Sequence, residues 1–121
     1  MAYKILVCDD AAFHRLTLCH LLEKEGYEIA GQAENGEEAV ALYQSLRPDL
    51  VTLDITMPVM GGLEALELIR KADKSARILM VSALGQQGQV KQALAMGAKD
   101  YVVKPYQPDR LLEAVKKALA G

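Results

Sequence analysis

Residues 3–10 read YKILVCDD. The continuous apolar run from Ile5 to Cys8 is typical of a strand that is buried on both faces of a parallel sheet. Two acidic residues, Asp9 and Asp10, follow at the point where this strand ends. Residues 11–25 then change to helical spacing, and the predicted buried face holds His14, Leu18, Leu21 and Leu22. This stretch therefore predicts a strand followed directly by a helix.

The same alternation returns four more times along the chain. Further strands are predicted over residues 27–33, 49–54, 77–82 and 100–104. Further helices are predicted from a cap at Asn35 to Pro48, over 62–73, over 85–96, and from Pro108 onward. Gly85 and Gly88 weaken the fourth of the five helices, so a short or mobile helix is expected there. Gly31 weakens the second strand, which favours a place at the sheet edge.

Five strand–helix units with short connections predict an α/β fold. The expected architecture is a flavodoxin-like three-layer sandwich of (βα)5 type, with a parallel sheet in the order 2-1-3-4-5. With 121 residues, the chain is expected to form one domain over 1–121 with no output domain.

The composition excludes several classes of protein. A hydrophobic share of 51% with 25% charged residues excludes a disordered chain. A net charge of −2 argues against nucleic-acid binding. No apolar run approaches the roughly 20 residues of a membrane helix, and the N-terminus does not resemble a signal peptide. Cys8 and Cys19 do not form a CxxC motif and predict a reducing cytoplasm, with Cys8 as an inert buried thiol and Cys19 off the apolar face of its helix.

Polar residues stand where the predicted strands end: Asp9 and Asp10 after the first, Asp54 on the third, Ser82 on the fourth and Lys104 on the fifth. A single Asp at such a place is usually a helix cap. Because the carboxyl ends of parallel strands share one edge, however, all five residues are expected to converge, with the acidic ones in the crevice between the first and third strands.

Carboxylates held this close repel one another unless a cation or a proton intervenes, and Mg²⁺ is the cation that suits oxygen ligands best. A divalent ion, the Lys104 ammonium and the Ser82 hydroxyl together match the three equatorial oxygens of a transferring phosphoryl group. Asp54, on the middle strand, is then the candidate nucleophile, because carboxylates form acyl phosphates.

Four motifs carry a resemblance to a known family: CDD at 8–10, LDITMPVMGG at 53–62, VSA at 81–83 and VVKP at 102–105. In this order and spacing, the whole chain resembles response-regulator receiver domains, and within that family the stand-alone chemotaxis regulators. The resemblance implies that Asp54 is the phosphoacceptor and that Tyr101 is an aromatic switch residue.

The resemblance also implies the remaining roles at the site. Asp10, Asp54 and the backbone carbonyl of Thr56 are expected to bind Mg²⁺ directly, and Asp9 through water. Ser82 corresponds to the switch hydroxyl. Lys104 corresponds to the family's lysine, with a cis bond to Pro105. Thr56 and Leu84 are expected to control the access of water.

The implied function is a signalling switch that catalyses only its own phosphorylation and dephosphorylation. The implied partners are a chemotaxis histidine kinase, the flagellar motor switch protein and a dedicated phosphatase, and the protein is expected to be a cytoplasmic monomer. His14 departs from the family pattern, which commonly has Met there, and Gly61 stands where Asp or Asn is frequent.

Several alternatives remain open at this stage. A phosphorelay intermediate would pass its phosphoryl group to a histidine phosphotransfer protein. A flavodoxin-like FMN binder would need a phosphate loop where this chain has the acidic DDAAF, and a phosphatase of the haloacid dehalogenase type would need Asp in place of Thr56. A P-loop NTPase is excluded because its motif is missing. Gln86, Gln87, Gln89 and Gln92 indicate either a docking patch or a solvated helix face.

Overall fold

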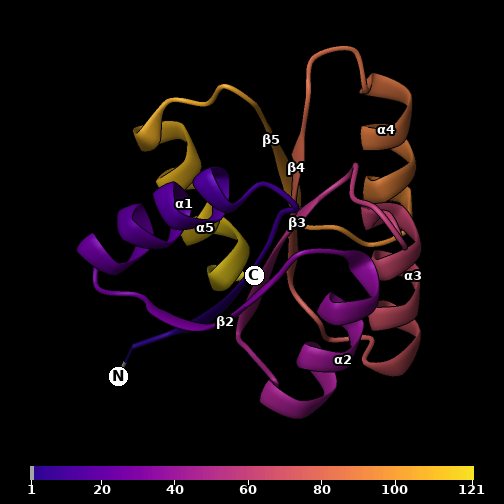
Figure 1. Ribbon diagram of the computed structural model, residues 1–121, viewed down its shortest axis with the longest axis horizontal. Coiled ribbons are helices and arrows are strands. Elements are labelled where there is room, and N and C mark those ends of the chain that lie inside the picture. The colour runs from indigo at the N-terminus through magenta and orange to yellow at the C-terminus, as the bar shows by residue number, and fades with distance from the viewer. Residues whose placement is uncertain (1) are drawn as a thin grey trace.

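A computed structural model of the chain describes residues 2–121. Strands and helices alternate strictly (Figure 1), in the order β1 Lys4–Cys8, α1 Ala12–Lys24, β2 Glu28–Ala33, α2 Gly36–Leu46, β3 Leu50–Asp54, α3 Gly62–Ala72, β4 Ile78–Ser82, α4 Gln87–Ala95, β5 Asp100–Val103 and α5 Pro108–Ala120. The predicted elements are all present, and their bounds differ from the prediction by a few residues at most.

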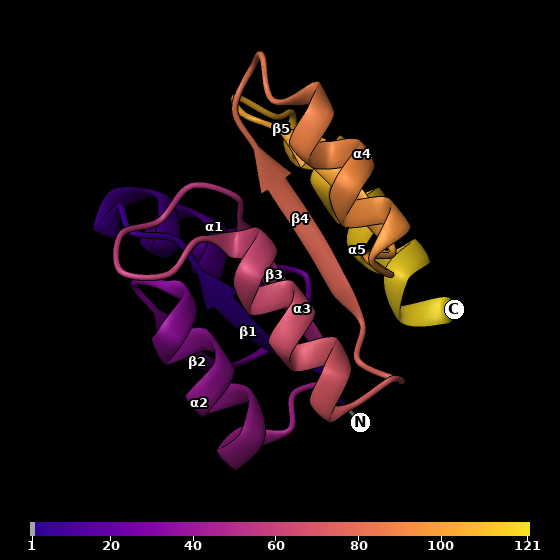
Figure 2. The same ribbon diagram turned by 90° about the vertical axis from the view of Figure 1, so that its right-hand side faces the viewer.

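The five strands form one parallel sheet in the order β2-β1-β3-β4-β5, as predicted. Helices α1 and α5 cover one face, and α2, α3 and α4 cover the other (Figure 1). Figure 2 looks onto the layer formed by α2, α3 and α4 and shows β1 and β4 running in the same direction. The carboxyl ends of β1, β3, β4 and β5 therefore lie along one edge.

The sheet divides the core into two apolar clusters. Leu6, Leu53 and Met80 face α2, α3 and α4, whereas Ile5, Val7 and Leu79 face α1 and α5. All six are fully buried, which is why the central strands have a continuous apolar sequence. Strand β2 pairs only with β1, and the register shifts where Leu6 meets Gly31. The weak second strand is thus an edge strand, as expected.

The turns that end the helices follow the sequence signals. The Asn35 side chain accepts a hydrogen bond from the Glu38 N–H at 2.9 Å and caps α2. Gly26 and Gly97, at φ +93° and +107°, stop α1 and α4 in a conformation that other residues rarely adopt. Gly85, at φ +88°, lies in the loop before α4, so the fourth helix is short, with nine residues.

Two predictions about α1 are wrong. His14 does not pack in the core, because its ring lies beside Asp9 and Lys104 at the surface, where its side chain is half exposed. Cys19, expected off the apolar face, is buried, because the face that meets the sheet consists of Leu18, Cys19 and Leu22. The buried face is thus rotated toward Cys19 from the predicted one.

Candidate phosphoryl-transfer site

Three carboxylates meet at the carboxyl edge between β1 and β3. Cys8 and Leu53 are paired in register, so the residues that follow them, Asp9 and Asp54, are neighbours across the two strands. Asp9 and Asp54 are each only 6% exposed, and Asp10 is exposed. One oxygen from each of the three lies within 4.8 Å of the other two. The acidic side chains are therefore brought together as the sequence predicts.

Lys104 reaches this acidic cluster from the end of β5. Its Nζ donates to Asp54 Oδ2 at 2.7 Å and to Asp9 Oδ2 at 2.8 Å. The backbone N–H of Lys104 donates to the Ser82 carbonyl at 2.7 Å, which fixes the residue against β4. The Lys104–Pro105 peptide bond is cis, as the resemblance implies. One ammonium group therefore bridges two buried carboxylates.

The electrostatics distinguish the two bridged carboxylates. Burial raises the pKa of Asp54 above its usual value, and this exceeds the opposing effect of the Lys104 ammonium. Burial also acts on Asp9, but the hydrogen bonds from Lys104 and the Ala11 N–H hold the pKa of Asp9 below its usual value. Burial acts to lower the pKa of Lys104, but the hydrogen bonds and negative charges of Asp54 and Asp9 outweigh burial and raise this pKa above its usual value. The pKa of Asp54 is thus shifted upward by burial, whereas the hydrogen bonds at Asp9 shift its pKa downward.

Close packing of glycine fixes the backbone around Asp54. Gly62 begins α3 directly against the Asp54 carbonyl, and a Cβ at residue 62 would lie 2.1 Å from that oxygen. The Gly62 N–H donates to the Ile55 carbonyl at 2.8 Å. Glycine is therefore required at residue 62 by contact with the backbone of Asp54.

Ser82 stands at the end of β4, beside Val81, the residue paired with Asp54. Ser82 is 1% exposed, and its hydroxyl has no hydrogen-bond partner within the described part of the chain. A buried hydroxyl without a partner is costly. Ser82 is thus at the predicted edge with an unused donor.

Thr56 and Gln86 connect two loops at the mouth of the site. The Thr56 N–H donates to Asp54 Oδ1 at 3.3 Å. The Thr56 hydroxyl accepts a hydrogen bond from Gln86 Nε2 at 2.7 Å, and Gln86 Oε1 accepts one from the Ala83 N–H at 2.7 Å. No sequence pattern indicates this link, because it depends on how the β3–α3 and β4–α4 loops fold.

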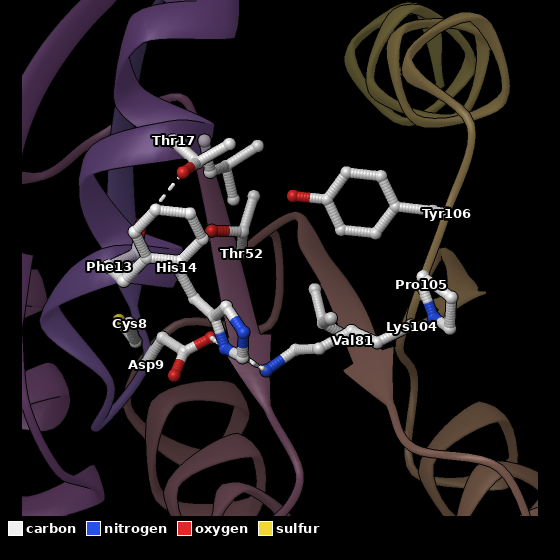
Figure 3. A pocket seen from close by; sticks show the side chains of 11 residues that line it. Cys8, Asp9, Phe13, His14, Thr17, Thr52, Val81, Lys104, Pro105 and Tyr106 are labelled. Carbon is white, nitrogen blue, oxygen red and sulfur yellow. Dashed lines mark hydrogen bonds and ion pairs between the residues drawn. The ribbon is translucent and has the colours of Figure 1, made fainter.

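A pocket of about 430 Å³ adjoins the cluster between α1 and the segment after β5 (Figure 3). His14 stands at its rim, with Nδ1 3.2 Å from Lys104 Nζ and 3.6 Å from Asp9 Oδ2. The interior is mostly apolar, and the Tyr106 hydroxyl points into it beside Thr52. His14 is thus a neighbour of the charged cluster, as its place beside the site in the family pattern implies, although its helical position predicted core packing.

Tyr101 lies on β5, half-buried against the core. A second pocket, of about 360 Å³, separates its ring from the first turn of α4 and is also lined by Ser82. The structure therefore brings Tyr101 and Ser82 to the same hollow, away from the acidic cluster.

Residues 5–116 match the sequence profile of the response regulator receiver domain. The chain belongs to this family.

Curated relatives agree with the assignment of a receiver domain. The chemotaxis protein CheY of Thermotoga maritima is 51% identical over 117 residues, which cover 97% of this chain and 98% of that protein. CheY of Bacillus subtilis is 53% identical over 119 residues, which cover 98% and 99% of the two chains. The chain is thus CheY-like along nearly its whole length, and it is a response regulator of the kind that phosphorylation activates.

Solved structures agree with the fold. The CheX–CheY–BeF₃–Mg²⁺ complex of Borrelia burgdorferi contains a chain that is 42% identical, with a TM-score of 0.90 over 93% of this receiver domain and 86% of that chain. The response regulator domain of Thermotoga maritima CheB is 34% identical, with a TM-score of 0.92 over 100% and 98% of the two chains. Across residues 2–121, no helix has the length and apolar character to cross a bilayer.

Proposed function

We propose that this receiver domain accepts a phosphoryl group on Asp54 from a histidine kinase, with Mg²⁺ as cofactor, and signals through the resulting change of shape. The observation that supports this most directly is the pair of bonds from Lys104 to Asp9 and Asp54. It places a fixed cation beside a buried carboxylate whose pKa is raised by burial.

The residues present fit a hard divalent cation. Asp9, Asp10 and Asp54 supply carboxylate oxygens within 4.8 Å of one another, which suits oxygen-seeking Mg²⁺. We propose Asp10, Asp54 and the Thr56 carbonyl as direct ligands and Asp9 as a ligand through water. When bound, Mg²⁺ would neutralise negative charge on the transferring phosphoryl group.

The proposed transfer needs no general base. An ionised Asp54 oxygen attacks phosphorus of the kinase phosphohistidine, a new O–P bond forms and the P–N bond breaks. The histidine nitrogen leaves with the electron pair of that bond and is protonated from solvent. Lys104 stays beside the oxygens of the transferred group, and the unpaired Ser82 hydroxyl donates to one of them. In dephosphorylation, a separate step, water attacks phosphorus, the O–P bond breaks and Asp54 leaves as a carboxylate. Inorganic phosphate and a proton pass to solvent, and Thr56 and Leu84 limit the approach of water.

The signal follows from the added charge, about −1.5 to −2 at one residue. Ser82 gains a partner by moving toward the phosphoryl oxygens. The hollow that it shares with Tyr101 then admits the Tyr101 ring, which alters the surface of α4, β5 and α5. If phosphorylation stabilises one conformation over the other by only a few kcal/mol, that difference in free energy is enough to change which conformation is populated.

The proposed partners follow from the relatives. We propose a chemotaxis histidine kinase as donor, a flagellar motor switch protein as target and a dedicated phosphatase, with the domain as a cytoplasmic monomer formed by 1–121. The Borrelia burgdorferi CheY chain was solved with a second protein bound, which supports recognition by protein partners. On this chain, Leu84 and Leu94 are 80% and 40% exposed and offer apolar contacts on the α4 side. A phosphorelay intermediate remains the alternative.

Labelled acetyl phosphate tests the proposal. With Mg²⁺, the protein should take up acid-stable, alkali-labile label, and EDTA or Asp54→Asn should abolish the uptake. Glu64→Gln, on the exposed side of α3, is the matched control and should label normally. Undiminished labelling of Asp54→Asn would contradict the assignment. Adding either a motor switch protein or a histidine phosphotransfer domain then separates the alternatives, because only a relay intermediate loses its label to the second protein.

A further inference from the structure

The Gln86 carboxamide joins two loops on either side of the site. Its Oε1 accepts from the Ala83 N–H at 2.7 Å, and its Nε2 donates to the Thr56 hydroxyl at 2.7 Å. The Thr56 N–H in turn contacts Asp54 Oδ1 at 3.3 Å. A chain of hydrogen bonds thus runs from Asp54 to the residue that follows Ser82.

Neighbouring glutamines show that this contact is particular to residue 86. Gln87 and Gln89 are exposed, and their side chains make no hydrogen bond with residues 2–121, whereas Gln86 is half-buried. Gln86 also occupies the N-cap position of α4, yet its side chain gives the helix no cap bond. The carboxamide is directed across the site instead of toward its own helix.

The bridge fixes the backbone directly after Ser82. Ala83 is bonded covalently to Ser82, and while its N–H is held by Gln86, the Ser82 hydroxyl stays buried without a partner. Gly85, at φ +88°, lies between this tether and α4, and Leu84 beside it is 80% exposed, so the loop can turn without disturbing the core. A movement of the Ser82 backbone toward Asp54 would carry the Ala83 N–H with it and strain the Gln86 contact.

We propose that Gln86 is a positioning residue that latches the β4–α4 loop to the β3–α3 loop in the unphosphorylated domain and is released when Asp54 is modified. This inference rests on the proposed function. A contact made in only one of two states shifts the equilibrium toward that state. The latch therefore opposes activation, and its removal should make the domain respond at a lower level of phosphorylation.

Beryllofluoride with Mg²⁺, a stable mimic of the phosphoryl group, tests the latch. Gln86→Met keeps the length of the side chain and removes both amide hydrogen bonds. Each is worth about 1 kcal/mol, so Gln86→Met should bind beryllofluoride about 10-fold or more tightly than the wild-type chain. Thr56→Val removes one of the two bonds and should give a smaller gain in the same direction. Gln87→Met is the matched control and should leave the affinity unchanged.

Hydrogen exchange gives a second readout. The Ala83 amide should exchange about 10-fold faster in Gln86→Met, because opening of the loop then breaks one hydrogen bond fewer. The Gln87→Met control should leave the exchange rate of the Ala83 amide unchanged. Tighter beryllofluoride binding together with faster exchange supports the latch. Unchanged or weaker binding in both Gln86→Met and Thr56→Val overturns it, and if Gln86→Met does not fold, Thr56→Val alone decides. Failure of the wild-type chain to label at Asp54 would instead overturn the proposed function.

Discussion

The two halves of the sheet's carboxyl edge are built in opposite ways. At β1 and β3, the buried carboxylates of Asp9 and Asp54 are both bonded to Lys104. At β4, the Ser82 hydroxyl is buried with no partner in residues 2–121, next to a hollow shared with Tyr101. Under the proposed function, charge is fixed in advance at β1 and β3, where the phosphoryl group would be transferred (the fixed half). The structure is left able to rearrange at β4, where the signal would be produced (the moving half).

The helices beside these halves differ in the same sense. Helix α3 has 11 residues, with Glu64 in its first turn and Arg70 and Lys71 in its last, which suits the helix dipole. Helix α4 has nine residues, no charged residue that suits the dipole at either end, and Gly88 within it. The moving half therefore contains the helix whose own sequence has the weaker preference for helical structure.

Removing Lys104 should produce the largest effect on the fixed half. In Lys104→Met, two charge-assisted hydrogen bonds are lost, and beryllofluoride affinity should fall about 100-fold. Mg²⁺ affinity without beryllofluoride should rise, because Asp9 and Asp54 lose the cation that neutralises them. Titrations of both ligands measure these opposite changes. Lys99→Met, at an exposed lysine, is the control, and a parallel loss of Mg²⁺ affinity in Lys104→Met would contradict the role of Lys104 as a competing cation.

Ser82→Ala tests the moving half. Removal of an unpaired buried hydroxyl should raise the free energy of unfolding by about 1 kcal/mol while abolishing the beryllofluoride-induced change in tyrosine fluorescence. Thr52→Val is the matched control, since the Thr52 hydroxyl is also buried without a partner in the described chain. It should give a similar gain in stability with the fluorescence response intact. A less stable Ser82→Ala would show that the hydroxyl is already satisfied.

Gly88→Ala should make α4 more like α3. No atom lies within 4 Å of a Cβ at residue 88, and its φ is not positive, so the substitution should stabilise the protein by about 1 kcal/mol. Urea unfolding measures the gain, and amide exchange within α4 should slow. Gly26→Ala, at φ +93°, should destabilise the protein instead. Equal effects at the two glycines would remove the evidence that α4 is limited by its own sequence.

A smaller effect is expected far from the site, where α2 meets the end of α3. The hydrogen bond from the Tyr43 hydroxyl to Asp73 Oδ2, at 2.6 Å, is the main cause that lowers the pKa of Asp73 to about 2. A lowered pKa stabilises the fold above about pH 4, and this contribution is lost as the pH falls through about 2. Tyr43→Phe should therefore be slightly less stable than the wild-type chain at pH 7, and the gap should shrink below pH 4 in urea unfolding. A gap that does not depend on pH would assign the effect to packing.

The fold was predictable because its signals are local. The apolar run from Ile5 to Cys8 and the similar runs in the later strands reveal which segments are buried. The parallel direction of the strands then follows from the alternation of strands and helices. The rotation of α1 was not predictable, because Phe13 and Leu16 are apolar yet 77% and 62% exposed, which blurs the apolar face. His14 and Cys19 were misplaced for this reason.

The acidic cluster was predictable for a similar reason, since each residue marks the end of a strand. Asp9, Asp54 and Lys104 meet because parallel strands end at one edge. The Gln86 bridge was not predictable, because it depends on the positive φ of Gly85 and on the path of two loops. Contacts between loops are set by tertiary structure and leave no periodic signal in the sequence.

We propose that Asp54, and neither of the acidic residues beside it, takes the phosphoryl group. Borohydride reduction of the protein after incubation with acetyl phosphate and Mg²⁺ converts an aspartyl phosphate to homoserine, which peptide mass spectrometry locates. We predict homoserine at residue 54 alone. Homoserine at residue 9 or 10, or stable label with no homoserine at residue 54, would overturn the assignment of Asp54 as the phosphoacceptor.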